Sequence, residues 1–183
     1  EAYNNQGVSL KNLNRMDDAI KSYDKATICH PQMTSAFSNK LMLLNYTNDY
    51  SPSFVFEEHA RFGKLMAGSN NREGRTLCVT HRGQGEKLRI GYVSPDFKVH
   101  SVAYFFHPLL INHDKSGFEI FCYYNGIQDD YMTKQLRSAS SHWYSIYNKP
   151  DGEVANLIQS HEIDILVDLA GHSADNRINV FAL

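Results

Sequence analysis

The chain has 183 residues, of which 42% are hydrophobic and 12% aromatic, enough for one ordinary domain or two small ones with a buried core. Eighteen Lys and Arg stand against twenty Asp and Glu, and this net charge of −2 argues against nucleic acid as a partner. The longest apolar stretch, residues 102–111, is interrupted by His107 and Pro108 and is too short to cross a bilayer, so no membrane partner is expected.

The cysteines indicate a reducing compartment. Cys29, Cys78 and Cys122 are odd in number and lack close spacing, and no signal peptide is visible, which favours a cytoplasmic protein. Cys78 and His81 have a metal-like spacing, but the sequence offers no second pair, so zinc is not expected. The chain begins without a methionine and stops at Leu183 within a regular pattern, which predicts a fragment.

The first 47 residues or so are expected to form helices. Apolar residues recur at helical spacing on both sides of a polar turn at Asn14, and Pro31 ends the second helix. Gly7 is small enough for two antiparallel helices to approach closely, while Tyr23 supplies the bulk between them. Residues 36–46 predict a further helix that covers the pair.

This pattern resembles a tetratricopeptide repeat. Five of its eight signature positions match, two hold tolerated variants (Tyr3 and Leu10) and Gln6 departs where leucine is usual. The full set of positions is Tyr3, Gln6, Gly7, Leu10, Ala19, Tyr23, Ala26 and Pro31. Because one repeat cannot bury its own face, we expect further repeats before Glu1 or a capping helix after the pair.

A boundary between two domains is expected after these helices. Residues 51–66 predict another amphipathic helix, with Pro52 near its start and His59 as a packing residue at its boundary. The next stretch is polar and glycine-rich, and its Gly83-x-Gly85 precedes a strand, so it is no dinucleotide fingerprint. We therefore expect helices over 1–68, a linker over 69–87 and a second domain over 88–183.

From Leu88 onward, strands alternate with helices. Strands are predicted over 88–94, 118–124, 143–146 and 163–169, and helices over 101–113, 130–140 and 151–161. Pro95 ends the first strand because it has no backbone N–H for a sheet ladder. The alternation indicates parallel βαβ units, a Rossmann-like half-sheet whose ligands bind past the carboxyl ends of its strands.

Three stretches of this part are similar to the O-linked N-acetylglucosamine transferase family in its bacterial form: residues 88–110 (LRIGYVSPDFKVHSVAYFFHPLL), 118–124 (FEIFCYY) and 163–183 (IDILVDLAGHSADNRINVFAL). The resemblance implies an incomplete N-terminal lobe of a GT-B glycosyltransferase. Such enzymes move N-acetylglucosamine from UDP to Ser or Thr hydroxyls with inversion, without metal or other cofactor, and capture acceptor proteins through their repeats. Because the donor-binding lobe lies outside the sequence, we expect the fragment itself to be inactive.

The same resemblance points to His100 as the catalytic residue, acting as a base or as a group that positions the substrate. A histidine at a helix N-terminus meets the positive end of the helix dipole, which favours a neutral ring that can accept or donate a proton. The alternative is a histidine that merely caps its helix. Asp96 is expected to form a turn or to cap that helix.

Asp168, Gly171 and His172 follow the last strand and are expected to bind substrate. They lie at its carboxyl end, where Gly171 allows close approach of the backbone, although a plain strand-ending turn explains them equally well. Asn176 and Arg177 match the family motif that follows, where an arginine holds the loop or the lobe.

Two other functions stay open. The chain is alternatively a repeat-based scaffold that binds proteins and carries a non-catalytic transferase-like lobe, or, less well supported, a nucleotide-dependent oxidoreductase. The oxidoreductase lacks a glycine fingerprint after the first strand. The sugar also stays open, because related members transfer fucose on the same architecture.

Overall fold

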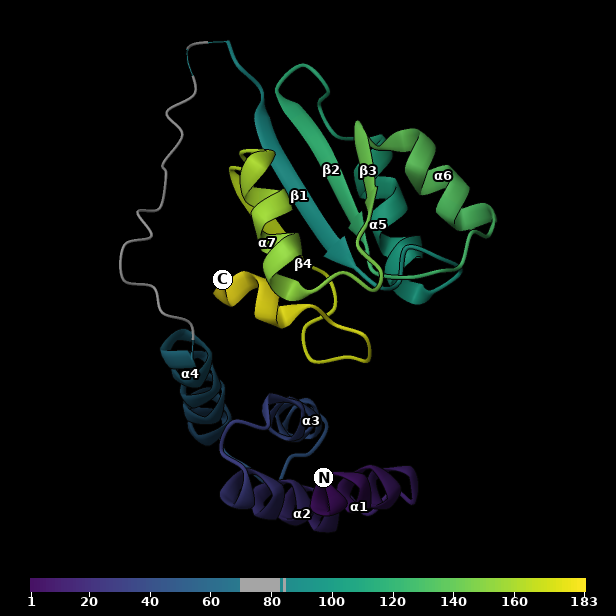
Figure 1. Cartoon of the computed structure of the whole chain (residues 1–183). Helices are drawn as coiled ribbons and strands as arrows, with labels where there is room; N and C mark the ends of the chain where they lie inside the picture. The colour runs from purple at the N-terminus through teal and green to yellow at the C-terminus, as the bar shows by residue number, and fades with distance from the viewer. Residues whose placement is uncertain (70–82, 84) are drawn as a thin grey trace. The chain divides into compact units, whose positions relative to one another are not determined.

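The chain folds as two compact units, residues 1–72 and 73–181 (Figure 1). The computed structural model describes residues 1–69, 83 and 85–183, so most of the predicted linker over 69–87 lies outside the described residues. The first unit is helical and the second combines helices with a parallel sheet. The expected class, a helical part followed by an α/β part, is confirmed.

The helical unit contains four helices: α1 (Ala2–Asn12), α2 (Met16–Cys29), α3 (Thr34–Leu44) and α4 (Pro52–Ser69). The first two form a hairpin whose turn places Asn14 at a φ of 57°, a left-handed conformation that asparagine tolerates. Gly7 lies against Tyr23, which is fully buried: a Cβ on Gly7 would stand 2.4 Å from Cε1 of its ring. The predicted close approach of the two helices at this glycine is therefore confirmed.

A buried ammonium group joins the later helices. Lys40 is 5% exposed, and its Nζ lies 2.6 Å from Oδ1 of Asp24 and 2.7 Å from Oε2 of Glu58. Burial disfavours the charged form, but hydrogen bonds to the two carboxylates outweigh it and raise the pKa of Lys40. The pair of contacts connects α3 to both α2 and α4.

The second unit alternates strands and helices as expected. Its elements are β1 (Leu88–Ser94), α5 (Ser101–Ile111), β2 (Phe118–Tyr124), α6 (Tyr131–Ala139), β3 (His142–Ser145), α7 (Asp151–Ser160), β4 (Ile165–Asp168) and a short 3₁₀ helix, η1 (Ile178–Ala182). The strands are all parallel, in the order β3-β2-β1-β4. Both strands predicted at 88–94 and 118–124 are confirmed at their full lengths.

The last strand is shorter than the predicted 163–169. It begins at Ile165 and ends at Asp168. Contacts with β1 continue past both ends: the N–H of Asp164 donates to the carbonyl of Arg89 at 2.9 Å, Oδ2 of Asp164 accepts from the N–H of Arg89 at 2.7 Å, and the N–H of Leu169 donates to the carbonyl of Val93.

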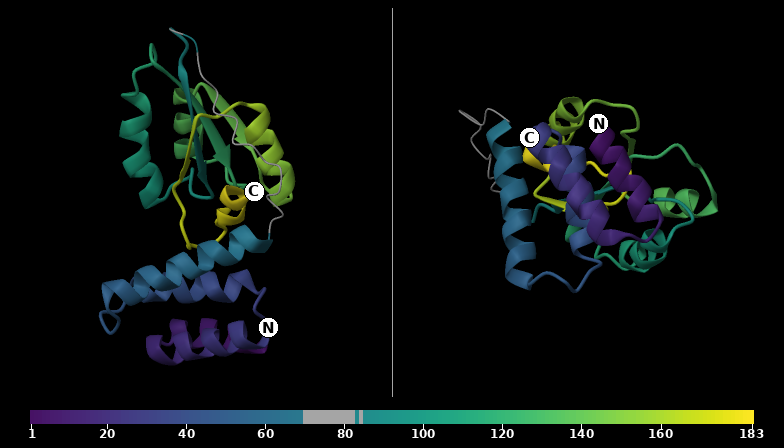
Figure 2. Two further views of the ribbon diagram at one scale, coloured as in Figure 1. Left: turned by 90° about the vertical axis from the view of Figure 1, so that its left-hand side faces the viewer. Right: turned by 90° about the horizontal axis from the view of Figure 1, so that it is seen from below.

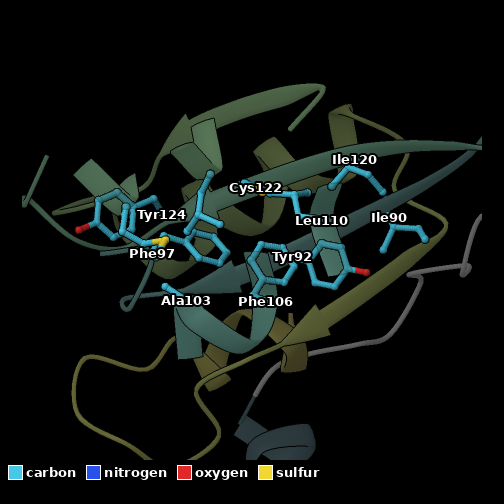
Figure 3. Close-up of a cluster of buried hydrophobic side chains, with 11 residues drawn as sticks. Ile90, Tyr92, Phe97, Ala103, Phe106, Leu110, Ile120, Cys122 and Tyr124 are labelled. Carbon is cyan, nitrogen blue, oxygen red and sulfur yellow. The ribbon is translucent and has the colours of Figure 1, made fainter. Parts of the chain in front are cut away.

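Helices cover both faces of the sheet (Figure 2). On one face, α5 and α6 pack over a core that includes Phe106, Leu110 and Leu136 against Tyr92 and Cys122 (Figure 3). On the other face, α7 packs through Val154 and Ile158 against a second cluster that includes Tyr123. This double cover explains why the central strands are apolar on both sides. Within the described ranges, no helix is both long and apolar enough to cross a membrane.

Candidate active site

The carboxyl ends of the parallel strands meet at one edge of the sheet, and the loops that carry the predicted site residues begin there. β1 ends at Ser94 and β4 at Asp168, and the register pairs Val93 with Asp168, so the two ends are immediate neighbours. The loop with His100 and the turn with Gly171 therefore start side by side. This edge is where open α/β sheets bind their ligands.

Hydrogen bonds hold the loop between β1 and α5 in place. The carboxylate of Asp130 accepts from the N–H of Val99 at 2.6 Å, and the hydroxyl of Thr133 donates to the carbonyl of Phe97 at 2.7 Å. Burial works against the charge of Asp130, but hydrogen bonds from Val99 and Thr133 lower its pKa. The loop that leads to His100 is thus anchored to the first turn of α6.

His100 is the N-cap of α5. Its backbone is extended, and Nδ1 accepts a hydrogen bond of 3.3 Å from the N–H of Val102, while the side chain stays 42% exposed. Because Nδ1 accepts, the neutral ring carries its proton on Nε2 and presents a donor. Asp96 does not cap the helix: its Oδ2 lies 3.8 Å from Nδ1 of His100, and its own N–H donates to Oγ of Ser94 within the turn. Of the two roles expected for Asp96, the cap is wrong, because His100 four positions later fills it, and the contact with Ser94 agrees with the turn.

Asp168, Gly171 and His172 occupy one turn. The carboxylate of Asp168 accepts from the N–H of Ala170 at 2.9 Å and from that of Gly171 at 3.0 Å, so both oxygens shape the backbone. Gly171 is exposed and has a φ of +56°, the left-handed region that favours glycine. His172 is partly buried. In this arrangement Asp168 holds the backbone of its own turn, and Gly171 is an exposed residue of that turn.

Asn125 joins the ends of two strands to a loop, and sequence reasoning missed it. Its backbone N–H donates to the carbonyl of Ser94 at 2.9 Å, which connects the end of β2 to the end of β1. Its side-chain Nδ2 donates to the carbonyl of Asp175 at 2.8 Å, in the loop after β4. Its position directly after a strand, at the carboxyl edge, is the signal that would have found it.

Arg177 connects the end of the same loop to α7. Its Nη2 donates to the carbonyl of Lys149 at 2.5 Å, and its Nε lies 3.0 Å from Oδ1 of Asp151. Asn176 closes the loop on itself through a bond from Nδ2 to the carbonyl of Ser173. These contacts agree with a role for Arg177 in loop geometry.

The described residues bring together no three His, Cys, Asp or Glu side chains that could hold a metal ion. The Cys78 and His81 pair lies outside the described residues.

Comparisons with known proteins agree with this geometry. The family model described as glycosyl transferase family 41 matches residues 73–183, which include the whole described edge. A probable UDP-N-acetylglucosamine–peptide N-acetylglucosaminyltransferase SPINDLY of Oryza sativa subsp. japonica is 31% identical over 167 residues, which cover 89% of this chain and 18% of that protein. The UDP-N-acetylglucosamine–peptide N-acetylglucosaminyltransferase of Caenorhabditis elegans is 34% identical over 101 residues, 54% of this chain and 9% of its own length.

A solved structure shares the fold. A mutant O-GlcNAc transferase of Thermobaculum terrenum superposes with a TM-score of 0.80 at 29% identity, covering 98% of this chain and 34% of that one. The chain thus spans only a minor part of the relatives that it matches. The family model, the relatives and the shared fold together confirm the resemblance: the chain belongs to glycosyl transferase family 41.

Proposed function

We propose that the protein to which this chain belongs transfers N-acetylglucosamine from UDP to Ser or Thr hydroxyls of acceptor proteins. The observation that carries the proposal is an exposed histidine, His100, at the carboxyl edge of a parallel sheet that the family model covers. The relatives are named as transferases of this sugar to peptides. In the proposed enzyme the described sheet is part of the N-terminal lobe of a GT-B fold, and the donor nucleotide binds on the other lobe.

The reaction requires one bond to form and one to break. The acceptor oxygen bonds to the anomeric carbon, the bond from that carbon to the diphosphate breaks, and the diphosphate leaves with the electron pair, which inverts the centre. Neither metal nor other cofactor is included in the proposal. Catalysis in such a site depends mainly on positioning and on stabilisation of the leaving charge.

His100 is proposed to position substrate by donating a hydrogen bond from Nε2. Support comes from Nδ1, which is already engaged with the N–H of Val102 and is the nitrogen without a proton in the neutral ring. To act as a base at Nδ1, the ring would have to break the hydrogen bond from the N–H of Val102 and would then no longer cap the helix. The proton of the acceptor hydroxyl is then proposed to go to the leaving diphosphate, the base that the reaction itself supplies.

The turn after β4 is proposed to contribute to substrate binding through Gly171 and His172. Asp168 is a positioning residue in this scheme, because its two carboxylate oxygens hold the backbone of the turn. Removal of that carboxylate should disturb the turn that Gly171 belongs to. Its effect on transfer would be indirect.

The helical unit is proposed to bind the acceptor, and α1 with α2 to be a tetratricopeptide-type repeat. Support comes from the tight contact between Gly7 and Tyr23 at two of the signature positions. A cytoplasmic location, where acceptor proteins are available, completes the proposal.

The experiment incubates the full-length protein with UDP-N-acetylglucosamine and acceptor peptides and measures added sugar by intact mass. His100→Ala removes both cap and donor, whereas His100→Asn keeps an N-cap acceptor and an amide donor. If His100 positions substrate, we expect His100→Ala to lower kcat/KM by about 10- to 100-fold, which corresponds to one lost hydrogen bond to a charged or polar group. His100→Asn should recover most of that loss.

Other results of this experiment would assign His100 a different role or contradict the proposed function. Equal loss in both variants would favour His100 as the base, and no loss in either would leave it as a helix cap alone. No sugar on any acceptor, by a wild type that nevertheless binds UDP, would contradict protein O-glycosylation.

A further inference from the structure

A shallow groove runs along the outer side of the helical layer, between α5 and α6. Its volume is about 460 Å³, and its lining includes the apolar Ile111 of α5 and Ala139 of α6 beside the polar Gln135 and Ser138 of α6. His107, Lys115 and Lys134 stand along it. Figure 1 shows the two helices next to each other on the same face of the sheet.

The groove carries positive charge that the neighbouring residues do not neutralise. No Asp or Glu lines it, and the side chains of Lys115 and Lys134 make no hydrogen bond or ion pair within residues 83 and 85–183 as described. Arg137 of α6 differs, because it is paired with Asp129 at 2.9 Å. Two ammonium groups that lack a carboxylate partner and lie beside apolar residues are notable in a chain whose net charge is −2.

Two tyrosines join the helices one turn beyond the groove. The hydroxyls of Tyr104 and Tyr131 lie 2.6 Å apart, connecting α5 to the first residue of α6. Along the groove itself, from His107 to Ile111, α5 rises by about 6 Å, the length of roughly two residues of extended peptide. The size of the groove thus suits a short peptide segment.

We propose that this groove binds an acidic, extended segment of a protein partner. Carboxylates of the segment would pair with Lys115 and Lys134, and an apolar side chain between them would cover Ile111 and Ala139. The charge of the groove argues for this occupant, since each ammonium lacks a carboxylate of its own. The inference does not rest on the proposed function, because the binding needs no sugar donor.

The test measures binding of a fluorescein-labelled peptide of alternating Glu and Leu to the full chain by anisotropy. A peptide with Gln in place of Glu is the neutral comparison. The double variant Lys115→Glu/Lys134→Glu should weaken binding of the acidic peptide about tenfold or more, the combined effect of two reversed surface pairs. Because both lysines are exposed, the fold should be unchanged, and circular dichroism checks this.

A matched control reverses two exposed lysines of the helical unit, Lys21→Glu/Lys64→Glu, which changes the net charge equally. We expect little change in binding for this control, and weaker binding of the acidic peptide by the wild type at higher salt. Equal binding of the acidic and neutral peptides would overturn the proposal, as would equal loss in the two double variants. Displacement by inorganic phosphate or by vesicles of anionic lipid, with Leu replaceable by Gly without loss, would also overturn it.

Discussion

The contact between Gly7 and Tyr23 makes a quantitative prediction about the helical unit. Changing Gly7 to Ala gains about 1 kcal/mol of helix propensity. The new Cβ, however, would meet three ring carbons of Tyr23 at 2.4, 2.7 and 2.8 Å, against about 3.5–4.0 Å for a good carbon contact. The ring is fully buried, so α1 and α2 must move apart.

Overpacking of this kind costs about 1–3 kcal/mol, and a displacement of more than an ångström belongs at the upper end. The net expectation for Gly7→Ala is a loss of about 2 kcal/mol of stability in the α1–α2 hairpin. Gly63 is the matched control, since it lies in α4 and a Cβ there would meet no atom within 4 Å. Gly63→Ala should therefore stabilise its helix by about 0.5–1 kcal/mol.

Native-state hydrogen exchange on the full chain separates the two effects by helix. Amides of α1 and α2 should exchange about thirtyfold faster in Gly7→Ala, because 1.4 kcal/mol is a factor of ten. Adding Tyr23→Leu should recover part of this protection by giving the new methyl group room. Unchanged or slower exchange in Gly7→Ala would refute the close packing on which the reasoning rests.

Three further predictions concern ionisable groups. Lys40→Met should destabilise the helical unit by about 3 kcal/mol in urea unfolding, because the largely buried carboxylate of Glu58 would keep only the longer contact of 3.6 Å to exposed Arg61. Burial raises the pKa of the Cys122 thiol to about 12, so iodoacetamide should alkylate exposed Cys29 and spare Cys122 until the chain unfolds; early labelling of both would contradict this. Burial, then the charges of a neighbouring histidine and arginine, lowers the pKa of His161. The unfolded chain therefore takes up a proton first, and stability should fall as the pH drops below about 6.5 and level off beneath the folded pKa, a loss that His161→Asn should reduce.

The sequence predicted where the site lies in the fold, but it did not predict the contacts within the site. An apolar run ended by Pro95, followed by helical spacing from Ser101, was sufficient to locate the loop that holds His100. The sequence left open whether His100 or Asp96 caps the helix, and the bond from the N–H of Val102 to Nδ1 of His100 decides for His100. The roles of Asp168, Gly171 and His172 toward a substrate stay predictions.

The sequence by itself determined the helical and parallel α/β parts, the full extent of β1 and β2, and the family. These follow from periodicity, from proline and glycine, and from local motifs, all of which act between near neighbours in the chain. Only the tertiary structure decided the strand order, the bounds of β4, and the hydrogen bonds by which Asn125 connects the ends of β1 and β2 to the loop after β4. The groove between α5 and α6 belongs with them, since it brings together side chains that are 19 or more positions apart in the sequence, such as Lys115 and Lys134. Hydrogen bonds and charges between such distant residues depend on where the folded backbone places them, and local pattern does not encode that placement.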